Sequence, residues 1–207
     1  MTPYYDLDTM VAMIDEPNRS ICQRAVSDNR TRFQQAAGSS YNHQAWAGGY
    51  WDHITEAMNI WLLLFGSFES TGRLSQLEPD ERFSRSDGLV VLFWHDIEKP
   101  WGFVLQDGKP VANEHGRLQR LPLMPDKTAR KAFAEAKIRE YGVVLSPALR
   151  NALDYVEGIR DTDYSPFDRR MRPLAALCHA CDMLSARAFY GFPLAADDAW
   201  GATRIVR

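Results

Sequence analysis

The amino-acid sequence predicts an all-α protein, a compact multi-helix bundle with a small β-hairpin inserted around residues 101–118. In the segment 51–70 the apolar residues recur at three- and four-residue steps, which is the period of a helix with one buried face. In the insertion, Asp107 and Gly108 stand between β-forming residues, as in the turn of a hairpin. No repeat or shift in composition divides the 207 residues, so we expect residues 1–207 to form a single domain.

Three helices are expected before the hairpin. Residues 18–37 contain mostly good helix formers, and a Gly-Ser-Ser sequence interrupts the pattern after them. Residues 51–70 form the most regular amphipathic segment. Residues 86–99 are apolar almost all round, so we expect a buried helix there that continues until Pro100 ends it.

Three further helices are expected after the hairpin. A Pro-Asp pair opens the segment 125–141, which is rich in alanine, lysine and glutamate. A Ser-Pro pair caps the next helix, within residues 146–158. The last long helix is expected within residues 170–190.

Composition and charge restrict the possible functions. The formal charge is −3 without a long run of lysine and arginine, so we expect no tight binding to duplex nucleic acid. The N-terminus has acidic residues where a signal peptide has basic ones, and the longest apolar run, residues 60–65, is too short to cross a membrane. We therefore expect a cytoplasmic protein without membrane contact, and a homo-oligomer stays open.

The three cysteines, Cys22, Cys178 and Cys181, are odd in number, which does not suit a disulfide framework. Cys178 and Cys181 form a CxxC sequence with two functional interpretations, a redox pair or half of a zinc site. No second CxxC completes a four-cysteine zinc site, and the pair lies in an apolar helical stretch. We therefore expect buried structural thiols.

The dipeptide His95-Asp96 is the most informative chemical feature. It lies at the end of the apolar segment 86–99, where two polar side chains are costly to bury without a partner. A divalent cation is a suitable partner, because an imidazole nitrogen and a carboxylate oxygen both coordinate it. The alternative for any single histidine is a hydrogen-bonded residue of the core.

Two other segments carry residues of ligand type. His43 and His53 lie on either side of a Gly-Gly turn, and His53 belongs to the most regular predicted helix. His179 and Asp182 are three residues apart, so they share one face of the last helix. Helical bundles build metal sites in this way, with ligands that several helices direct inward.

Three sequence segments resemble the HD-domain superfamily of metal-dependent phosphohydrolases, whose ordered pattern is His, His-Asp and Asp on separate helices. The segments are NHQAWAGGYWDHITEAM, WHDIEKP and LCHACDMLSAR, within residues 41–66, 86–103 and 170–192. They are similar to compact phage and bacterial HD proteins and to the HD domain of some bacterial 3′-to-5′ exoribonucleases. The resemblance implies an HD-type bundle whose metal ligands are His53, His95, Asp96 and Asp182.

The resemblance also implies one divalent ion, which could be Mn²⁺, Fe²⁺, Co²⁺, Ni²⁺ or Mg²⁺. Water bound to such an ion becomes more acidic and can attack phosphorus. Asp96 could then act as a general base, and Lys99 could contact a phosphate oxygen or could be a solvated lysine at a helix end. Glu98 stands where glycine is common in the family, and its extra carboxylate near the metal makes it a third catalytic candidate.

Other residues are candidates for substrate binding. His43 and His179 could contact a substrate phosphate, support the ligands through hydrogen bonds, or hold a second metal ion; we expect one of the first two roles. Arg170, with Arg169 and Arg172, could clamp a phosphate, because guanidinium groups match phosphate oxygens. The alternative for these arginines is a solvated loop in which they pair with nearby aspartates.

Three hypotheses about function follow. The first is hydrolysis of a nucleotide or deoxynucleotide phosphate by metal-activated water, with a small phosphorylated substrate as the binding partner. The second is a phosphodiesterase that cuts a cyclic nucleotide, an oligonucleotide or an RNA 3′ end. The third is a non-catalytic helical module that binds metal or ligand. The lack of a basic stripe favours the first over long nucleic acids.

Overall fold

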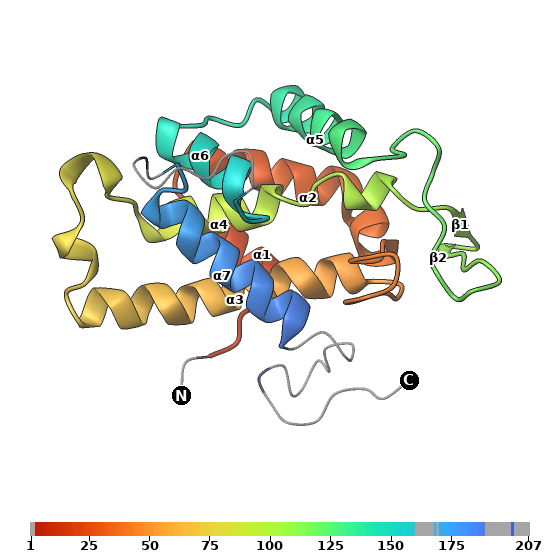
Figure 1. Ribbon diagram of the computed structural model, residues 1–207, viewed down its shortest axis with the longest axis horizontal. Coiled ribbons are helices and arrows are strands. Elements are labelled where there is room, and N and C mark those ends of the chain that lie inside the picture. The colour runs from red at the N-terminus through yellow and green to blue at the C-terminus, as the bar shows by residue number, and fades with distance from the viewer. Residues whose placement is uncertain (1–2, 160–167, 169, 189–199, 201–207) are drawn as a thin grey trace.

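The computed structural model describes residues 3–159, 168, 170–188 and 200. This part of the chain contains seven α-helices, three short 3-10 helices and one two-stranded antiparallel sheet (Figure 1). The prediction of an all-α fold with one small hairpin is therefore confirmed. The α-helices are α1 (Leu7–Ala12), α2 (Asn18–Gln35), α3 (Gly49–Ser70), α4 (Arg85–Trp94), α5 (Lys127–Tyr141), α6 (Pro147–Tyr155) and α7 (Pro173–Arg187). The other elements are η1 (Leu74–Gln76), η2 (Pro79–Glu81), η3 (Lys99–Trp101), β1 (Leu105–Gln106) and β2 (Lys109–Pro110).

The observed helices match the six predicted ones and add α1, which is too short for its apolar period to be recognised. Side-chain caps explain where four of the helices begin, because each accepts a hydrogen bond from a backbone N–H in the first turn. The capping residues are Asp6 for α1, Ser84 for α4, Asp126 for α5 and Ser146 for α6. The predicted end of the last helix at residue 190, and Arg169 with residues 161–167 of the charged segment, lie outside the described residues.

Helix α4 ends earlier than predicted, at Trp94 rather than just before Pro100. Proline has no N–H to donate to the carbonyl four residues before it, and its ring clashes with that carbonyl in a helix. The chain therefore leaves the α-helical path one turn earlier and forms η3 instead. As a result, His95 and Asp96 lie in the turn after α4, and the helical period of α4 does not set the directions of their side chains.

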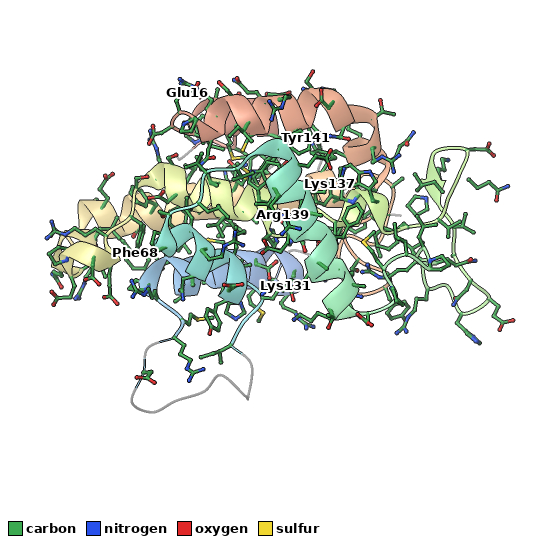
Figure 2. The ribbon with its side chains drawn as sticks, turned by 90° about the horizontal axis from the view of Figure 1, so that it is seen from above. Glu16, Phe68, Lys131, Lys137, Arg139 and Tyr141 are labelled. Carbon is green, nitrogen blue, oxygen red and sulfur yellow. The ribbon has the colours of Figure 1, made fainter. Side chains whose placement is uncertain are left out.

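Helix α3 is the longest and runs along one side of the molecule, where α7 and α4 pack against it (Figure 1). Helix α6 packs in turn on α7 and α4. The close approach of α3 and α4 depends on Gly88, because a Cβ there would lie 2.0 Å from a ring carbon of Trp61. This packing brings the end of α4 beside the first half of α3 and the second half of α7. Helix α5 lies at the top of the molecule; Figure 2, seen from above, shows it on the near side.

The hairpin forms where it was predicted, with β1 and β2 paired antiparallel. Asp107 and Gly108 have φ angles of 49° and 74°, the left-handed values that a two-residue hairpin turn of this kind requires. Beyond the strands, the chain pairs again at an isolated bridge between Phe103 and Arg120. Arg120 Nε also donates a hydrogen bond to Ser40 Oγ at 3.0 Å, which ties the insertion to the loop before α3.

Two smaller predictions concern the cysteines and the membrane. Cys22, Cys178 and Cys181 are free and buried, so the prediction that these thiols are buried is confirmed. Burial raises the pKa of Cys22 to about 12, which keeps it in the unreactive thiol form. In the part of the chain that the structure describes, no helix combines the length and the apolar character needed to cross a membrane.

Candidate metal centre

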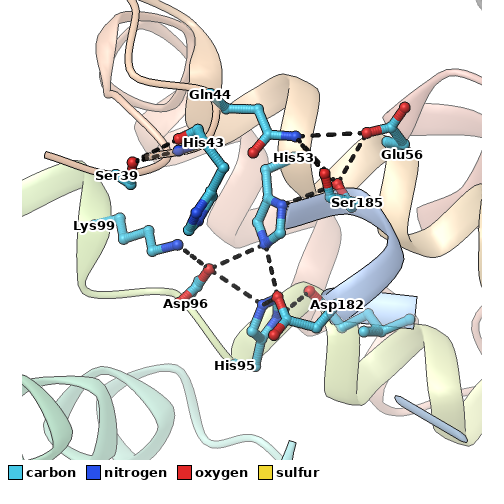
Figure 3. Close-up of polar contacts among 11 residues, drawn as sticks. Ser39, His43, Gln44, His53, Glu56, His95, Asp96, Lys99, Asp182 and Ser185 are labelled. Carbon is cyan, nitrogen blue, oxygen red and sulfur yellow. Dashed lines mark hydrogen bonds and ion pairs between the residues drawn. The ribbon is translucent and has the colours of Figure 1, made fainter. Parts of the chain in front are cut away.

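Four side chains from three parts of the bundle meet at one largely buried point (Figure 3). His53 comes from α3, His95 and Asp96 from the turn after α4, and Asp182 from α7. One nitrogen or oxygen atom of each lies within 4.8 Å of the others, so the group could hold a metal ion. We call these four residues the metal cluster. The structure thus brings together all the residues that the HD resemblance implies as ligands.

The separations in the metal cluster suit one shared cation. His53 Nε2 lies 3.3 Å from Asp96 Oδ2 and 3.1 Å from Asp182 Oδ1. His95 Nε2 lies 3.1 Å from Asp96 Oδ2 and 3.6 Å from Asp182 Oδ1. Ligand atoms about 2.1 Å from one ion are roughly 3.0 Å apart at right angles and roughly 3.4 Å apart at tetrahedral angles. Three of the four separations fall in this range and the fourth, 3.6 Å, is slightly longer, so the cluster could hold a single small divalent ion.

Each imidazole ring of the cluster is oriented by a hydrogen bond at Nδ1, the nitrogen that does not face the aspartates. His95 Nδ1 lies 2.8 Å from the carbonyl oxygen of Leu92, which can only accept, so Nδ1 carries the proton. His53 Nδ1 lies 3.0 Å from Ser185 Oγ, and it is also the donor, because Ser185 gives its own proton to Glu56. In the neutral rings, Nε2 then presents a lone pair to the carboxylates. Both Nε2 atoms are buried without a hydrogen bond, which is the arrangement of metal-binding imidazoles.

A layer of hydrogen bonds behind His53 fixes its ring (Figure 3). Ser185 Oγ donates to Glu56 Oε2 at 2.9 Å, and Gln44 Nε2 donates to the Ser185 carbonyl oxygen at 3.1 Å. Gln44 reaches this position through a left-handed backbone, with a φ of 42°. The Gly-Gly turn makes room for it, because a Cβ at Gly49 would lie 1.8 Å from the Gln44 carbonyl oxygen. Gly49, the first residue of α3, therefore allows Gln44 to approach the site.

The charges of the metal cluster depend on one another. Burial alone would raise the pKa of Asp96, but the charges of Lys99 and His95 outweigh it and hold this pKa well below its usual range. Burial also opposes the ionisation of Asp182, whose pKa is nevertheless lowered by its contacts with His53 and His95. For His95, burial lowers the pKa, but the two aspartates raise it well above the usual value. Besides the charge of Lys99, the cluster therefore requires a second positive charge, which is either a proton on His95 or a metal ion.

Lys99 and Glu98 lie beside the metal cluster. Lys99 is only 8% exposed and forms an ion pair with Asp96 Oδ2, so its interpretation as a solvated lysine is wrong. Burial lowers the pKa of Lys99, but Asp96 and Glu98 raise it by more, which keeps the ammonium charged. Burial and the charge of Asp96 raise the pKa of Glu98 to about 7. Glu98 can therefore hold or release a proton near neutral pH.

A pocket of about 300 Å³ opens over the metal cluster, and His43 and His179 both line it. His179 Nδ1 donates to the Val156 carbonyl oxygen at 2.7 Å, which leaves Nε2 for a ligand. Burial, with the nearby charge of Lys99, lowers the pKa of His43 to about 3, so this ring is neutral at physiological pH. Neither histidine belongs to the group of atoms that could share one ion. Their positions suit contacts with a substrate.

Among the described residues, the pocket has as many basic as acidic side chains. The basic ones are Lys99, Arg120, Arg130 and Arg187, and the acidic ones are Asp96, Glu98, Glu157 and Asp182. These four positive and four negative side chains cancel when Glu98 is ionised. A bound divalent cation would therefore make the pocket positive by two charges, which attracts an anionic ligand.

The arginines of the pocket differ from those that the sequence suggested. Arg170 is exposed and precedes α7, whereas Asp182 lies nine residues after the first residue of α7, roughly 14 Å along its axis. Arg170 does not line the pocket, so its position gives no support to a phosphate contact. Arg120 and Arg130 do line it, and no motif pointed to them. Only the return of the hairpin and the start of α5 bring these two residues to the site.

No protein-family model, curated protein or solved structure matches this chain. The features that indicate a function are therefore the metal cluster, the polar side chains behind it and the pocket above it. These features are local and chemical, and each can be tested by substitution.

Proposed function

We propose that this chain is a metal-dependent phosphohydrolase of the HD type that acts on a small phosphorylated substrate, a nucleotide or deoxynucleotide phosphate. The observation that carries the proposal is the metal cluster, in which two carboxylates face two buried imidazole nitrogens without hydrogen bonds. The order of these residues along the chain, His53, His95-Asp96 and Asp182, is the order of the HD family. The pocket above the cluster supports access for a substrate.

The residues around the cluster suit phosphate chemistry. Four protein ligands leave open positions on an ion of six-coordination, and a divalent ion there would polarise a phosphoryl oxygen and acidify a water molecule. Lys99 holds a positive charge beside Asp96, where it can bind a phosphoryl oxygen as negative charge develops. Glu98, with its pKa of about 7, can hold or release a proton near the cluster, and His179 keeps Nε2 for a contact with the substrate.

One observation favours a second candidate, a non-catalytic helical module. Lys99 and a protonated His95 can neutralise Asp96 and Asp182 without any metal ion. The cluster would then be an ion-pair network that holds α3, α4 and α7 together. Removing one partner from such a network costs about 3–5 kcal/mol, because a buried charge is left uncompensated. Metal binding is the property that separates the two candidates.

Metal titration provides the decisive experiment. The protein is stripped with a chelator, titrated with Mn²⁺ by calorimetry, and its metal content is determined by mass spectrometry. We expect one ion per chain in the wild type and loss of binding in Asp182→Asn. Asp8→Asn is the matched control, because Asp8 is an exposed carboxylate that pairs with Arg30 on the surface. A wild-type protein that binds no metal, or unchanged binding in Asp182→Asn, refutes the proposal.

Product analysis then tests the substrate class. The Mn²⁺-loaded protein is incubated with nucleoside mono- and triphosphates, cyclic nucleotides and a short oligonucleotide, and the products are separated by chromatography. Release of inorganic phosphate or triphosphate is the expected result, and Asp96→Asn should abolish it. Opening of a cyclic nucleotide or shortening of the oligonucleotide would instead assign a phosphodiesterase.

A further inference from the structure

Arg120 and Arg130 line the pocket over the metal cluster, and neither belongs to the group of residues that could hold the metal ion. Arg120 follows the hairpin, and Arg130 lies in the first turn of α5. We call these two residues the arginine wall. They come from segments different from those that supply the metal cluster, which are α3, the turn after α4, and α7. The pocket is therefore lined by the metal cluster, in which acidic and basic groups meet, and by the arginine wall, in which both groups are positive.

Arg120 is held firmly but is not fully partnered. Its Nε donates to Ser40 Oγ at 3.0 Å, and its guanidinium group lies 4.9 Å from the centre of the Phe103 ring. Its Nη1 packs close to Gly102, where a Cβ would lie 3.4 Å away. That Nη1 is buried without a hydrogen-bond partner among the described residues. A buried donor without an acceptor is unfavourable, and an anionic ligand offers the oxygen atoms that arginine donors match best.

Arg120 and Arg130 line the same pocket, so their like charges oppose each other. Burial lowers the pKa of Arg120, and the charge of Arg130 lowers it further; Glu98 and Asp96 offset part of this effect. The Arg120 side chain contacts a hydroxyl group and an aromatic ring, neither of which neutralises its charge. Two like charges held together in a half-buried pocket are relieved by an anion, and most by one with two negative charges.

We propose that the arginine wall binds the phosphate group of the substrate and selects a terminal, dianionic phosphate over a phosphodiester. This inference rests on the proposed function, because it names the substrate class of the same site. A terminal phosphate has three non-bridging oxygens and, above a pKa of about 6, two negative charges. The metal cluster, Lys99 and Arg120 offer three separate positions for phosphate oxygens. A diester, with two such oxygens and one charge, leaves one position unused.

The test measures the binding of inorganic phosphate and of dimethyl phosphate, a diester analogue, to the full-length protein with and without Mn²⁺. Isothermal calorimetry gives the affinities without any need for turnover. We expect phosphate to bind the Mn²⁺-loaded wild type and dimethyl phosphate to bind at least about tenfold more weakly. Arg120→Gln should weaken phosphate binding by about tenfold or more, because it removes charge-assisted hydrogen bonds. Arg130→Gln should weaken it by a smaller factor.

Two exposed arginines provide matched controls. Arg117→Gln changes the same hairpin, and Arg139→Gln changes the same helix α5, on which Figure 2 labels Arg139. Both variants should bind phosphate as the wild type does. If Arg120→Gln does not fold, Arg120→Lys replaces it, because lysine keeps the charge but loses the planar fork of donors. Phosphate affinity in Arg120→Lys should still fall severalfold.

The outcomes separate this inference from the proposed function. Phosphate affinity that is unchanged in Arg120→Gln or Arg120→Lys overturns the inference, and so does equal affinity of the wild type for phosphate and dimethyl phosphate. Hydrolysis at the wild-type rate by Mn²⁺-loaded Arg120→Gln would refute the arginine wall and leave the proposed function intact. Phosphate binding that depends on Arg120 in a protein that binds no metal would support the wall and refute the proposed function.

Discussion

The metal cluster and the arginine wall face the same pocket but differ in how they are held. In the cluster, opposite charges meet, and hydrogen bonds to Leu92 and Ser185 orient both imidazole rings. In the wall, like charges meet on two segments outside the central helices, α3, α4 and α7. The cluster can stabilise the folded chain by itself, whereas the wall is complete only when an anion binds. Substitutions in the metal cluster should therefore change both the stability of the protein and its affinity for Mn²⁺. Substitutions in the arginine wall should change only the affinity for phosphate.

The largest effect is expected for His95→Ala. This change removes one metal ligand and leaves Asp96 and Asp182 without the positive ring between them. We expect the affinity for Mn²⁺ to fall by more than about a hundredfold, because losing a metal ligand weakens binding more than losing a residue that hydrogen-bonds to a ligand. The free energy of unfolding of the metal-free protein should fall by about 3–5 kcal/mol. Calorimetric titration and urea denaturation measure the two quantities.

His115→Ala is the control for this substitution. The His115 side chain is 80% exposed in the hairpin region, so its removal should leave both the metal affinity and the stability unchanged. If His95→Ala binds Mn²⁺ as tightly as the wild type, the metal cluster is not a metal site. If only its stability falls, the cluster is the ion-pair network of the second candidate.

A smaller effect is expected for Ser185→Ala, which leaves every ligand in place. The His53 Nδ1–H loses its acceptor and Glu56 loses a donor, so the ring is no longer fixed. Substitutions in this outer layer typically reduce metal affinity by about 10- to 100-fold. Ser67→Ala, at an exposed position of α3, should have no such effect. Equal metal affinity in the two variants would show that the orientation of His53 does not depend on this layer.

The metal cluster could be predicted from the sequence, and the arginine wall could not, for a physical reason. The cluster residues sit in short segments where polar ligand types interrupt helical apolar patterns, and such interruptions are visible in sequence. Arg120 and Arg130 share no period or motif and meet only because the Phe103 bridge and the start of α5 bring them together. The early end of α4 was also missed, because residues 95–99 are almost all buried and a buried turn has the same composition as a buried helix.

The pH dependence of stability should reveal the charge that the metal cluster requires. The pKa values of Asp96 and Asp182 are lowered, so their stabilisation is present above the usual value of 3.8 and is lost as the pH falls below it. The pKa of His95 is raised, so its contribution is complete below 6.5 and is lost as the pH rises through the value in the folded protein. The raised pKa of Glu98 also reduces stability as the pH increases from 4.5 to about 7.

These groups should therefore stabilise the metal-free protein most near about pH 4.5, and their contribution should fall as Glu98 ionises in the unfolded chain and, above about pH 6.5, as His95 loses its proton. Mn²⁺ should move the optimum to higher pH, because the ion replaces the proton on His95 and binds the neutral ring. Thermal unfolding across this pH range, with and without Mn²⁺, measures the shift. The loss of stability at higher pH should be smaller in His95→Ala than in His115→Ala. An optimum that Mn²⁺ does not move would contradict the role assigned to His95.

The smallest effect is expected for Arg130→Gln in the absence of phosphate. Removing one of two repelling charges should leave the free energy of unfolding within about 0.5 kcal/mol of the wild type, on the stabilising side if it changes at all. Arg150→Gln is the contrasting variant, because Arg150 forms an ion pair with Glu135 at 2.6 Å and its loss should destabilise the protein by up to about 1 kcal/mol. Urea denaturation with and without phosphate measures both. Phosphate should then stabilise the wild type more than Arg130→Gln. A large loss of stability in Arg130→Gln without phosphate would mean that the folded chain already satisfies this arginine, and the wall would be structural like the cluster.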